Sequence, residues 1–449
     1  MRSISSLAAA AAALLACRAS DDAPAGPPAI ESFTASPAAA TPGVPVVLRP
    51  VFRGGAGRIW PLVGPVESGG AYTVGPFAGP VRFELHVERG AERANADVLV
   101  PFGYRHRFVA IAAGGYARAG HGAVQLADGR VLLFGGESDG PTFWDTAEIF
   151  DPATATFTRT GDLTIERARA PAARVGLAEV LAAGGESSSG LASTRVEVWS
   201  GATGAWEARG TLAAGRTAHT VTALETGEVL VLGGDFMGER VGSHPTEEIL
   251  DPGTGATRAP RGSAMVQGRF GHSATFLGDG RVLVAGGWNS FYGVAAVEAE
   301  LFDPRDETFA YAGALAAPRG SHRAVALRDG RVLVVGGLDD VGPVAAAEVW
   351  DPATGLWSPA GSLVTARMDP EAVELASGEV LVAGGYDGEG KPLADVETWD
   401  PAAGTFTARP PLASPRAGHA LVRLPDARVL VHGGAGSGGW PVAAAELYE

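Results

Sequence analysis

Seven glycine pairs divide most of this chain into nearly equal lengths. They begin at Gly135, Gly184, Gly233, Gly286, Gly336, Gly384 and Gly433, and successive pairs start 48 to 53 residues apart. Seventeen residues before each pair stands an arginine: Arg118, Arg167, Arg216, Arg269, Arg319, Arg367 and Arg416. Each pair is followed by a glutamate: Glu148, Glu197, Glu248, Glu300, Glu348, Glu397 and Glu446. A period of this length predicts a fold built from copies of one supersecondary unit.

The spacing inside each copy separates strands from loops. The span from arginine to glycine pair never varies, which is typical of paired strands, because one inserted residue would turn every side chain to the other face. The span from the first glycine to the glutamate varies from 12 to 15 residues, which predicts a loop. β-Branched runs such as VLVV at 332–335 indicate buried strands. Asp-Gly at 128–129, 279–280 and 329–330 predicts two-residue type I′ hairpin turns.

Two further features recur late in the copies. Asp-Pro stands at 151–152, 251–252, 303–304, 351–352 and 400–401, where it predicts a turn after the third strand. Aromatic residues precede the next arginine by ten residues at Phe157, Trp206, Phe309, Trp357 and Phe406. We expect these aromatic side chains to pack between neighbouring sheets.

The combined pattern Arg-x-x-His, Asp-Gly, Gly-Gly, Glu-x-x-Asp-Pro, Trp resembles the kelch motif, over roughly residues 104–449. The resemblance implies an all-β fold, with seven four-stranded blades around a central channel. The last copy ends at Glu449 without an outer strand, so we expect residues 105–112 to complete it and remove an exposed edge. Some copies depart from the motif, with Ala170 and Pro370 in place of histidine and Ser200-Gly201 in place of Asp-Pro.

The first 28 residues have the composition of an export segment and a tether. One arginine precedes the apolar run from Leu7 to Ala16, which is too short for a permanent membrane span and is typical of a signal peptide, residues 1–16. The run ends in Leu14-Leu15-Ala16-Cys17, which resembles a bacterial lipoprotein box, so Cys17 is the expected lipidation site. A plain secretory signal is the alternative. Residues 17–28 are polar and Pro-rich, which predicts a tether.

Residues 29–103 carry a different pattern. Short alternating segments, AIESFTASP, VPVVLRPVF, AYTVGP, VRFELHVERG and ADVLVPF, are separated by glycine and proline. This pattern predicts a small β-sandwich and resembles immunoglobulin-like or PKD-like modules. We expect the module to act as a spacer.

Charge and histidine placement exclude some functions and disfavour others. The formal net charge of −15 argues against a nucleic-acid binder, which needs a basic face. His121, His219, His272, His322 and His419 occupy one repeat position and therefore lie in separate blades, whereas zinc sites need converging ligands. We predict no metal site and no cofactor, and we interpret the repeated glutamates as structural.

The arginines have two interpretations. In kelch propellers the loop before the first strand and the loop after Gly-Gly open on one face around the channel mouth. Arg118, Arg216, Arg269, Arg319, Arg367 and Arg416 could then bind carboxylate or sulfate groups there. The alternative is that the glutamate of each repeat neutralises its arginine.

The variable loops are the other candidate recognition surface, because loops on a rigid scaffold carry function. Their aromatic residues are Trp144, Phe236, Trp288, Phe291, Tyr292, Tyr386 and Trp440. Exposed aromatics are typical of interaction hot spots and also suit stacking on sugars.

These observations favour an exported, lipid-anchored binding protein of the bacterial envelope that recognises a protein or a glycan. A carbohydrate-active enzyme and a purely structural envelope component are the alternatives. Galactose oxidase has kelch-like repeats and a copper site with a tyrosine crosslinked to cysteine, but the only cysteine here is Cys17, outside the repeats. The sequence shows no serine-nucleophile elbow, phosphate loop or His-Glu zinc motif.

Overall fold

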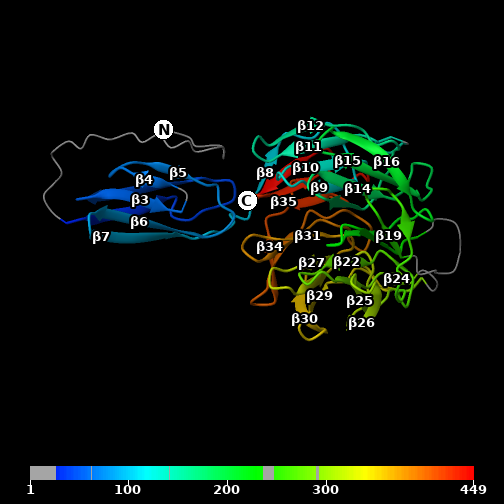
Figure 1. Ribbon diagram of the computed structural model, residues 1–449. Helices are drawn as coiled ribbons and strands as arrows, with labels where there is room; N and C mark the ends of the chain where they lie inside the picture. The colour runs from blue at the N-terminus through cyan, green and yellow to red at the C-terminus, as the bar shows by residue number, and fades with distance from the viewer. Residues whose placement is uncertain (1–26, 62, 141, 236–246, 290–292) are drawn as a thin grey trace. The chain divides into compact units, whose positions relative to one another are not determined.

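The computed structural model describes residues 27–449 except 62, 141, 236–246 and 290–292. The chain divides into an N-terminal unit, Met1–Arg105 with Pro425–Arg428 and Glu449, and a repeat unit, His106–Leu424 with Val429–Tyr448. All regular structure in the described residues is β-strand (Figure 1). Within these described ranges, no helix has the length and apolarity needed to cross a membrane.

The N-terminal unit contains two antiparallel sheets. One has the order β1 (Ala29–Ser36), β2 (Val46–Arg53), β5 (Tyr72–Val74); the other has the order β4 (Gly64–Val66), β3 (Ala56–Trp60), β6 (Val81–Arg89), β7 (Glu92–Val100). Strands were expected in five segments of this region, and each of those segments contains one. The short strands β3 and β4, which the pattern had not indicated, complete the second sheet.

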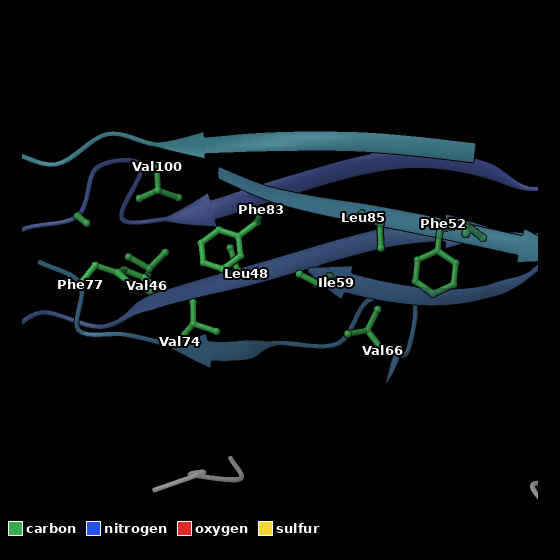
Figure 2. Packing of buried hydrophobic residues seen from close by; sticks show 12 residues of the cluster. Val46, Leu48, Phe52, Ile59, Val66, Val74, Phe77, Phe83, Leu85 and Val100 are labelled. Atoms are coloured by element: carbon green, nitrogen blue, oxygen red, sulfur yellow. The ribbon is translucent and has the colours of Figure 1, made fainter. Parts of the chain in front are cut away.

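One apolar core holds the two sheets of this unit together. Alternate residues of β2 and β6, among them Val46, Leu48, Phe83 and Leu85, are fully buried, as period-2 alternation requires (Figure 2). Gly57 in β3 leaves room for the ring of Phe52, since a Cβ at that glycine would lie 2.3 Å from it. The unit is therefore a two-layer sandwich with its own core.

The repeat unit contains seven four-stranded antiparallel sheets in its described residues (Figure 1). We number them sheet 1 to sheet 7 and give each strand order from the innermost strand outward. Sheet 1 is β9 (Gly122–Gln125), β10 (Val131–Phe134), β11 (Ala147–Asp151), β12 (Thr156–Arg159), and sheet 2 is β13 (Ala172–Val175), β14 (Glu179–Ala183), β15 (Arg195–Ser200), β16 (Ala205–Thr211). Sheet 3 is β17 (Thr220–Ala223), β18 (Val229–Leu232), β19 (Glu248–Leu250), β20 (Thr257–Arg258), and sheet 4 is β22 (Ser273–Phe276), β23 (Val282–Ala285), β25 (Glu298–Asp303), β26 (Thr308–Ala314). Sheet 5 is β27 (Arg323–Ala326), β28 (Val332–Val335), β29 (Ala346–Asp351), β30 (Leu356–Ser362); sheet 6 is β31 (Glu371–Glu374), β32 (Val380–Ala383), β33 (Val396–Asp400), β34 (Thr405–Arg409); and sheet 7 is β35 (Ala420–Arg423), β36 (Val429–His432), β37 (Ala445–Tyr448), β8 (Phe108–Ile111). A two-stranded sheet pairs β21 (Arg269–Phe270) with β24 (Trp288–Asn289).

The seven sheets form a closed circle. Each innermost strand contacts that of the next sheet, from β9 through β13, β17, β22, β27 and β31 to β35, and β35 contacts β9. Sheet 7 takes its outer strand from the beginning of the repeats, because β8 pairs with β37 and places Phe108 opposite Tyr448. The circle is thus joined by strands from both ends of the unit.

Apolar clusters fill the space between neighbouring sheets. The aromatic residues before each arginine lie in these clusters: Phe157 between sheets 7 and 1, Trp206 between 1 and 2, Phe309 between 3 and 4, Trp357 between 4 and 5, and Phe406 between 5 and 6. Apart from Glu179 at the start of β14, every residue of the second strands is buried, as their apolar runs indicated. The expectation that these aromatics pack between sheets is confirmed.

The Asp-Gly turns differ from the predicted type I′ hairpins. Gly129 has a positive φ of 90°, but Asp128 does not, whereas a type I′ turn requires positive φ at both residues. The turn spans four residues, and the Gly129 N–H donates to the Leu126 carbonyl at 3.0 Å. The Asp128 carboxylate accepts the N–H of Arg130 at 3.0 Å, so the aspartate fixes the turn through its side chain.

Candidate functional site at the mouth of the central cavity

The seven repeated arginines are buried and paired. Each side chain has at most 1% of its surface exposed and contacts the glutamate of its own repeat. Arg319 is representative: its Nη2 donates to Glu348 at 2.9 Å, and its Nη1 donates to the carbonyls of Gly336 and Ala346. Burial lowers the pKa of the guanidinium group, and the charge of Glu348 opposes that shift. These contacts fit the second interpretation, in which the glutamate of each repeat neutralises its arginine. The repeated arginines therefore do not form a circle of exposed guanidinium groups that a ligand could contact.

The repeated histidines join adjacent sheets. Imidazole Nε2 of His272 lies 3.0 Å from the hydroxyl of Thr220, and Nε2 of His322 lies 2.9 Å from that of Ser273. In both cases the partner is four residues after the arginine of the preceding sheet. His121 contacts His432 of sheet 7 at 3.2 Å. In the described part of the chain, no three His, Cys, Asp or Glu residues are grouped so that they could hold a metal ion.

A cavity of about 1000 Å³ lies inside the circle of innermost strands. Its walls come from β9, β13, β17, β22, β27, β31 and β35 and from the residues just before them. Cavities of this size accommodate organic ligands. The cavity occupies the place of the central channel that the kelch resemblance implied.

A ring of seven residues surrounds the end of the cavity where the innermost strands begin. We call it the mouth ring; it consists of the residues two after each repeated arginine, Gly120, Arg169, Ala218, Gly271, Ser321, Asp369 and Gly418. All seven have φ between 48° and 60°, the left-handed region that favours glycine. Backbone N–H groups donate around the ring at 2.7–2.9 Å, from Gly120 to Gly418, Arg169 to Gly120, Gly271 to Ala218, Ser321 to Gly271 and Asp369 to Ser321. The strained backbone is therefore held in place by its neighbours.

The Arg169 side chain lies over Gly120 of the mouth ring. A Cβ at Gly120 would lie 3.1 Å from its Cγ, so the glycine provides the space for the arginine side chain. The guanidinium forms ion pairs with Glu186, at 2.6 Å, and with Glu137. Two carboxylates thus share one cation at this point of the mouth.

Asp369 lies on the opposite part of the mouth ring and has a different environment. Its side chain is accessible from the cavity, yet protein walls enclose it, and this burial raises the pKa of its carboxyl. The Ser321 side chain and the charge of Arg169 act in the opposite direction and lower this pKa. No ion pair joins Asp369 to any residue that the structure describes. The pKa of the nearby Tyr386 phenol is raised by burial and by the charges of Asp369 and Glu137.

A second carboxylate lies deeper on the same wall. Glu371, at the start of β31, pairs with Arg323 of β27 at 3.0 Å. Burial raises the pKa of Glu371, the charge of Arg323 lowers it, and Asp369 raises it further. At the equivalent position the other sheets carry Gly122, Pro171, Thr220, Ser273 and Ala420, so the charges are confined to sheets 5 and 6.

The predicted loop aromatics have different fates. The indole of Trp288 lies over Gly320, where a Cβ would be 2.1 Å from its Nε1, and it is half-buried beside Gly271 of the mouth ring. Tyr386 is also half-buried, near Asp369. Trp144 folds back onto Tyr116, and its Nε1 donates to the Ala117 carbonyl at 2.7 Å. Trp440 is 63% exposed. Phe236, Phe291, Tyr292 and the lipidation candidate Cys17 lie outside the described residues.

Sequence reasoning missed Arg169, Asp369 and Glu371. A signal for them was present, because aligning the seven copies places charged residues where the other copies have glycine, alanine, serine, threonine or proline. Departures from the repeat, rather than the repeated residues, mark the wall of the cavity.

Residues 319–363 and 372–413 match the Kelch motif. These segments cover sheet 5 and most of sheet 6. The repeat unit has a β-propeller fold, and two of its repeats match the Kelch motif. A fungal alcohol oxidase of the AA5 family, solved in complex with copper, resembles the chain with a TM-score of 0.60. It shares 16% sequence identity, and the likeness covers 76% of this chain and 75% of the oxidase. At this identity the likeness concerns the fold. A comparison with curated proteins finds no match.

Proposed function

We propose that this protein is an exported, lipid-anchored binding protein of the bacterial envelope that recognises a glycan at the mouth of its propeller. The observation that carries this proposal is the mouth itself. The half-buried rings of Trp288 and Tyr386 lie beside the polar groups of Ser321 and Asp369, above a cavity of about 1000 Å³. Sugars present apolar faces that stack on aromatic rings and hydroxyl groups that donate to carboxylates.

The proposed organisation has four parts. Residues 1–16 form the signal, Cys17 carries the lipid, and residues 17–28 tether the protein. Residues 29–103 form an immunoglobulin-like spacer, and residues 104–449 form a seven-bladed propeller closed by the strand within 105–112. Support comes from the short apolar leader that ends at the only cysteine and from the separate core of the N-terminal sandwich. It also comes from the seven four-stranded sheets and from the pairing of β8 with β37.

A protein partner is the second candidate, because apolar side chains are exposed on the loops that follow the glycine pairs. Leu191, Val294, Val341 and Trp440 are between 45% and 96% exposed. Exposed apolar residues on loops are common in protein interfaces. Such a partner would contact the loops rather than the mouth.

An enzyme acting on carbohydrate is supported by one feature, the two cavity carboxyls Asp369 and Glu371 with raised pKa values. A raised pKa favours the protonated form of a carboxyl, which general acid catalysis uses. Incubation of the full chain with oligosaccharides would release reducing ends if this function applied, and their absence would leave binding as the function.

Replacing Tyr386 with Ala is expected to weaken glycan binding about tenfold, because it removes an aromatic surface beside Asp369. Calorimetric titration of the full chain with a panel of neutral, acidic and amino-bearing oligosaccharides measures the effect. Trp440→Ala is the matched control, since it removes an exposed aromatic from a loop, and affinity should change less than twofold. Loss of binding with Trp440→Ala alone would contradict the mouth site and favour recognition by the loops.

A further inference from the structure

We infer that the ligand is a glycan with a free, positively charged amino group, and that Asp369 and Glu371 hold this group at the cavity wall. The inference rests on the proposed glycan function and specifies its ligand class. It places the ammonium group below the mouth ring, on the wall formed by sheets 5 and 6. The sugar ring would then lie between this wall and the aromatic residues Trp288 and Tyr386.

The balance of charge at the mouth is negative. Arg169 is shared by Glu137 and Glu186, and Arg323 pairs with Glu371. These two cations therefore face three carboxylates before Asp369 is counted. Asp369, which no described residue meets in an ion pair, adds a fourth. A bound ammonium group would supply the missing positive charge, whereas an acidic sugar would be repelled.

The position of Asp369 makes this charge available to a ligand. Its N–H is fixed in the mouth ring by the Ser321 carbonyl at 2.9 Å, and its side chain is accessible from the cavity. An ionised carboxylate enclosed by protein is costly unless a cation or several donors satisfy it. Among the described residues, the Ser321 side chain and the charge of Arg169 are the two influences that favour the ionised form. The phenol ring of Tyr386 nearby is a further partner that attracts cations through its face.

A buried imidazole without a hydrogen-bond partner lies at the start of sheet 7, next to sheet 6 of this wall. His419 is 3% exposed, lines the cavity, and neither ring nitrogen has a hydrogen-bond partner in the described structure. His272 and His322, at the same repeat position, each contact the residue four after the arginine of the preceding sheet. For His419 that residue is Glu371. By analogy with His272 and His322, the His419 imidazole faces Glu371, with the capacity to accept an N–H.

The test compares three oligosaccharides of equal length with the full chain: a β-1,4-linked glucosamine tetramer, its fully N-acetylated form and a β-1,4-linked glucose tetramer. At pH 6 and low salt, we expect the free amine form to bind at least tenfold tighter than the other two. Asp369→Asn should abolish this preference, and asparagine tolerates the left-handed backbone that the position requires. Glu389→Gln, which neutralises an exposed loop carboxylate paired with Lys391, is the matched control and should keep the preference.

The outcomes separate the two proposals. Equal binding of all three tetramers would overturn the amine subsite and leave glycan binding standing. Binding of a simple polyamine such as spermidine as tightly as the glucosamine tetramer, with loss in Asp369→Asn, would support the amine subsite and overturn the glycan function. Binding of none of these ligands would overturn both. Melting curves of each variant, with Glu371→Gln as a second probe of the wall, show whether a lost preference comes from misfolding.

Discussion

Lowering the pH from 8 to 5 is expected to reduce the melting temperature of the propeller by about 10 °C. His219, His322, His419 and His432 have pKa values lowered to about 3 by burial and by nearby arginine charges, and the pKa of His272 lies well below the ordinary value. In the unfolded chain these groups bind protons below about pH 6.5. Their contribution to stability is therefore complete above that pH and is lost progressively as the pH falls toward 3. Each histidine costs about 2 kcal/mol at pH 5, about 10 kcal/mol for the five if they add.

Three carboxyls oppose this trend. The pKa values of Glu247, Asp369 and Glu371 are raised by burial, so their protonation as the pH falls favours the folded state. Calorimetry between pH 5 and pH 8 measures the net effect. His322→Gln should reduce the pH dependence by about one fifth, whereas His86→Gln, a change in a half-exposed side chain of the N-terminal sandwich, should leave it unchanged. A propeller that is equally stable at both pH values would contradict the neutral, buried state of the histidines.

Arg319→Met is expected to lower the free energy of unfolding by about 3–5 kcal/mol. The substitution keeps the apolar part of the side chain but leaves the Glu348 carboxylate buried without its cation and the carbonyls of Gly336 and Ala346 without their donor. Denaturant titration followed by tryptophan fluorescence measures the loss. Ligand affinity per folded molecule should be unchanged, because the guanidinium is fully buried.

The matched control for this substitution is Arg159→Met. Arg159 forms an ion pair with Asp162 at 2.6 Å, but its side chain is 60% exposed. Exposed pairs contribute little to stability, since water and salt screen them. Similar losses for both variants would show that burial does not set the energetic role of the repeated arginines. A fall in ligand affinity with Arg319→Met would instead show that the repeated arginines take part in binding.

The two stability predictions concern the arginines and histidines that recur in the repeat. Arginine and glutamate recur in all seven copies and histidine in five, and the structure places each arginine on its own glutamate and most of the histidines at seams between sheets. Repetition of a residue in every copy indicated a structural role, because a contact needed by every sheet must recur in every sheet. The proposed ligand site follows the opposite rule, since Asp369, Glu371 and Arg169 are found in single copies.

The sequence alone determined the period, the strands and the glutamate available to each arginine, because these depend on residue spacing along one unit. It also indicated that aromatics would lie between sheets, because large apolar side chains at a fixed position must be buried somewhere. Only the tertiary structure decided which side chains of neighbouring sheets contact each other. Arg169 reaches Glu137 of the preceding sheet, Arg323 reaches Glu371 of the next, and Trp288 lies on Gly320. These contacts join residues about 30 to 50 positions apart, and the packing of neighbouring sheets, rather than local spacing, brings them together.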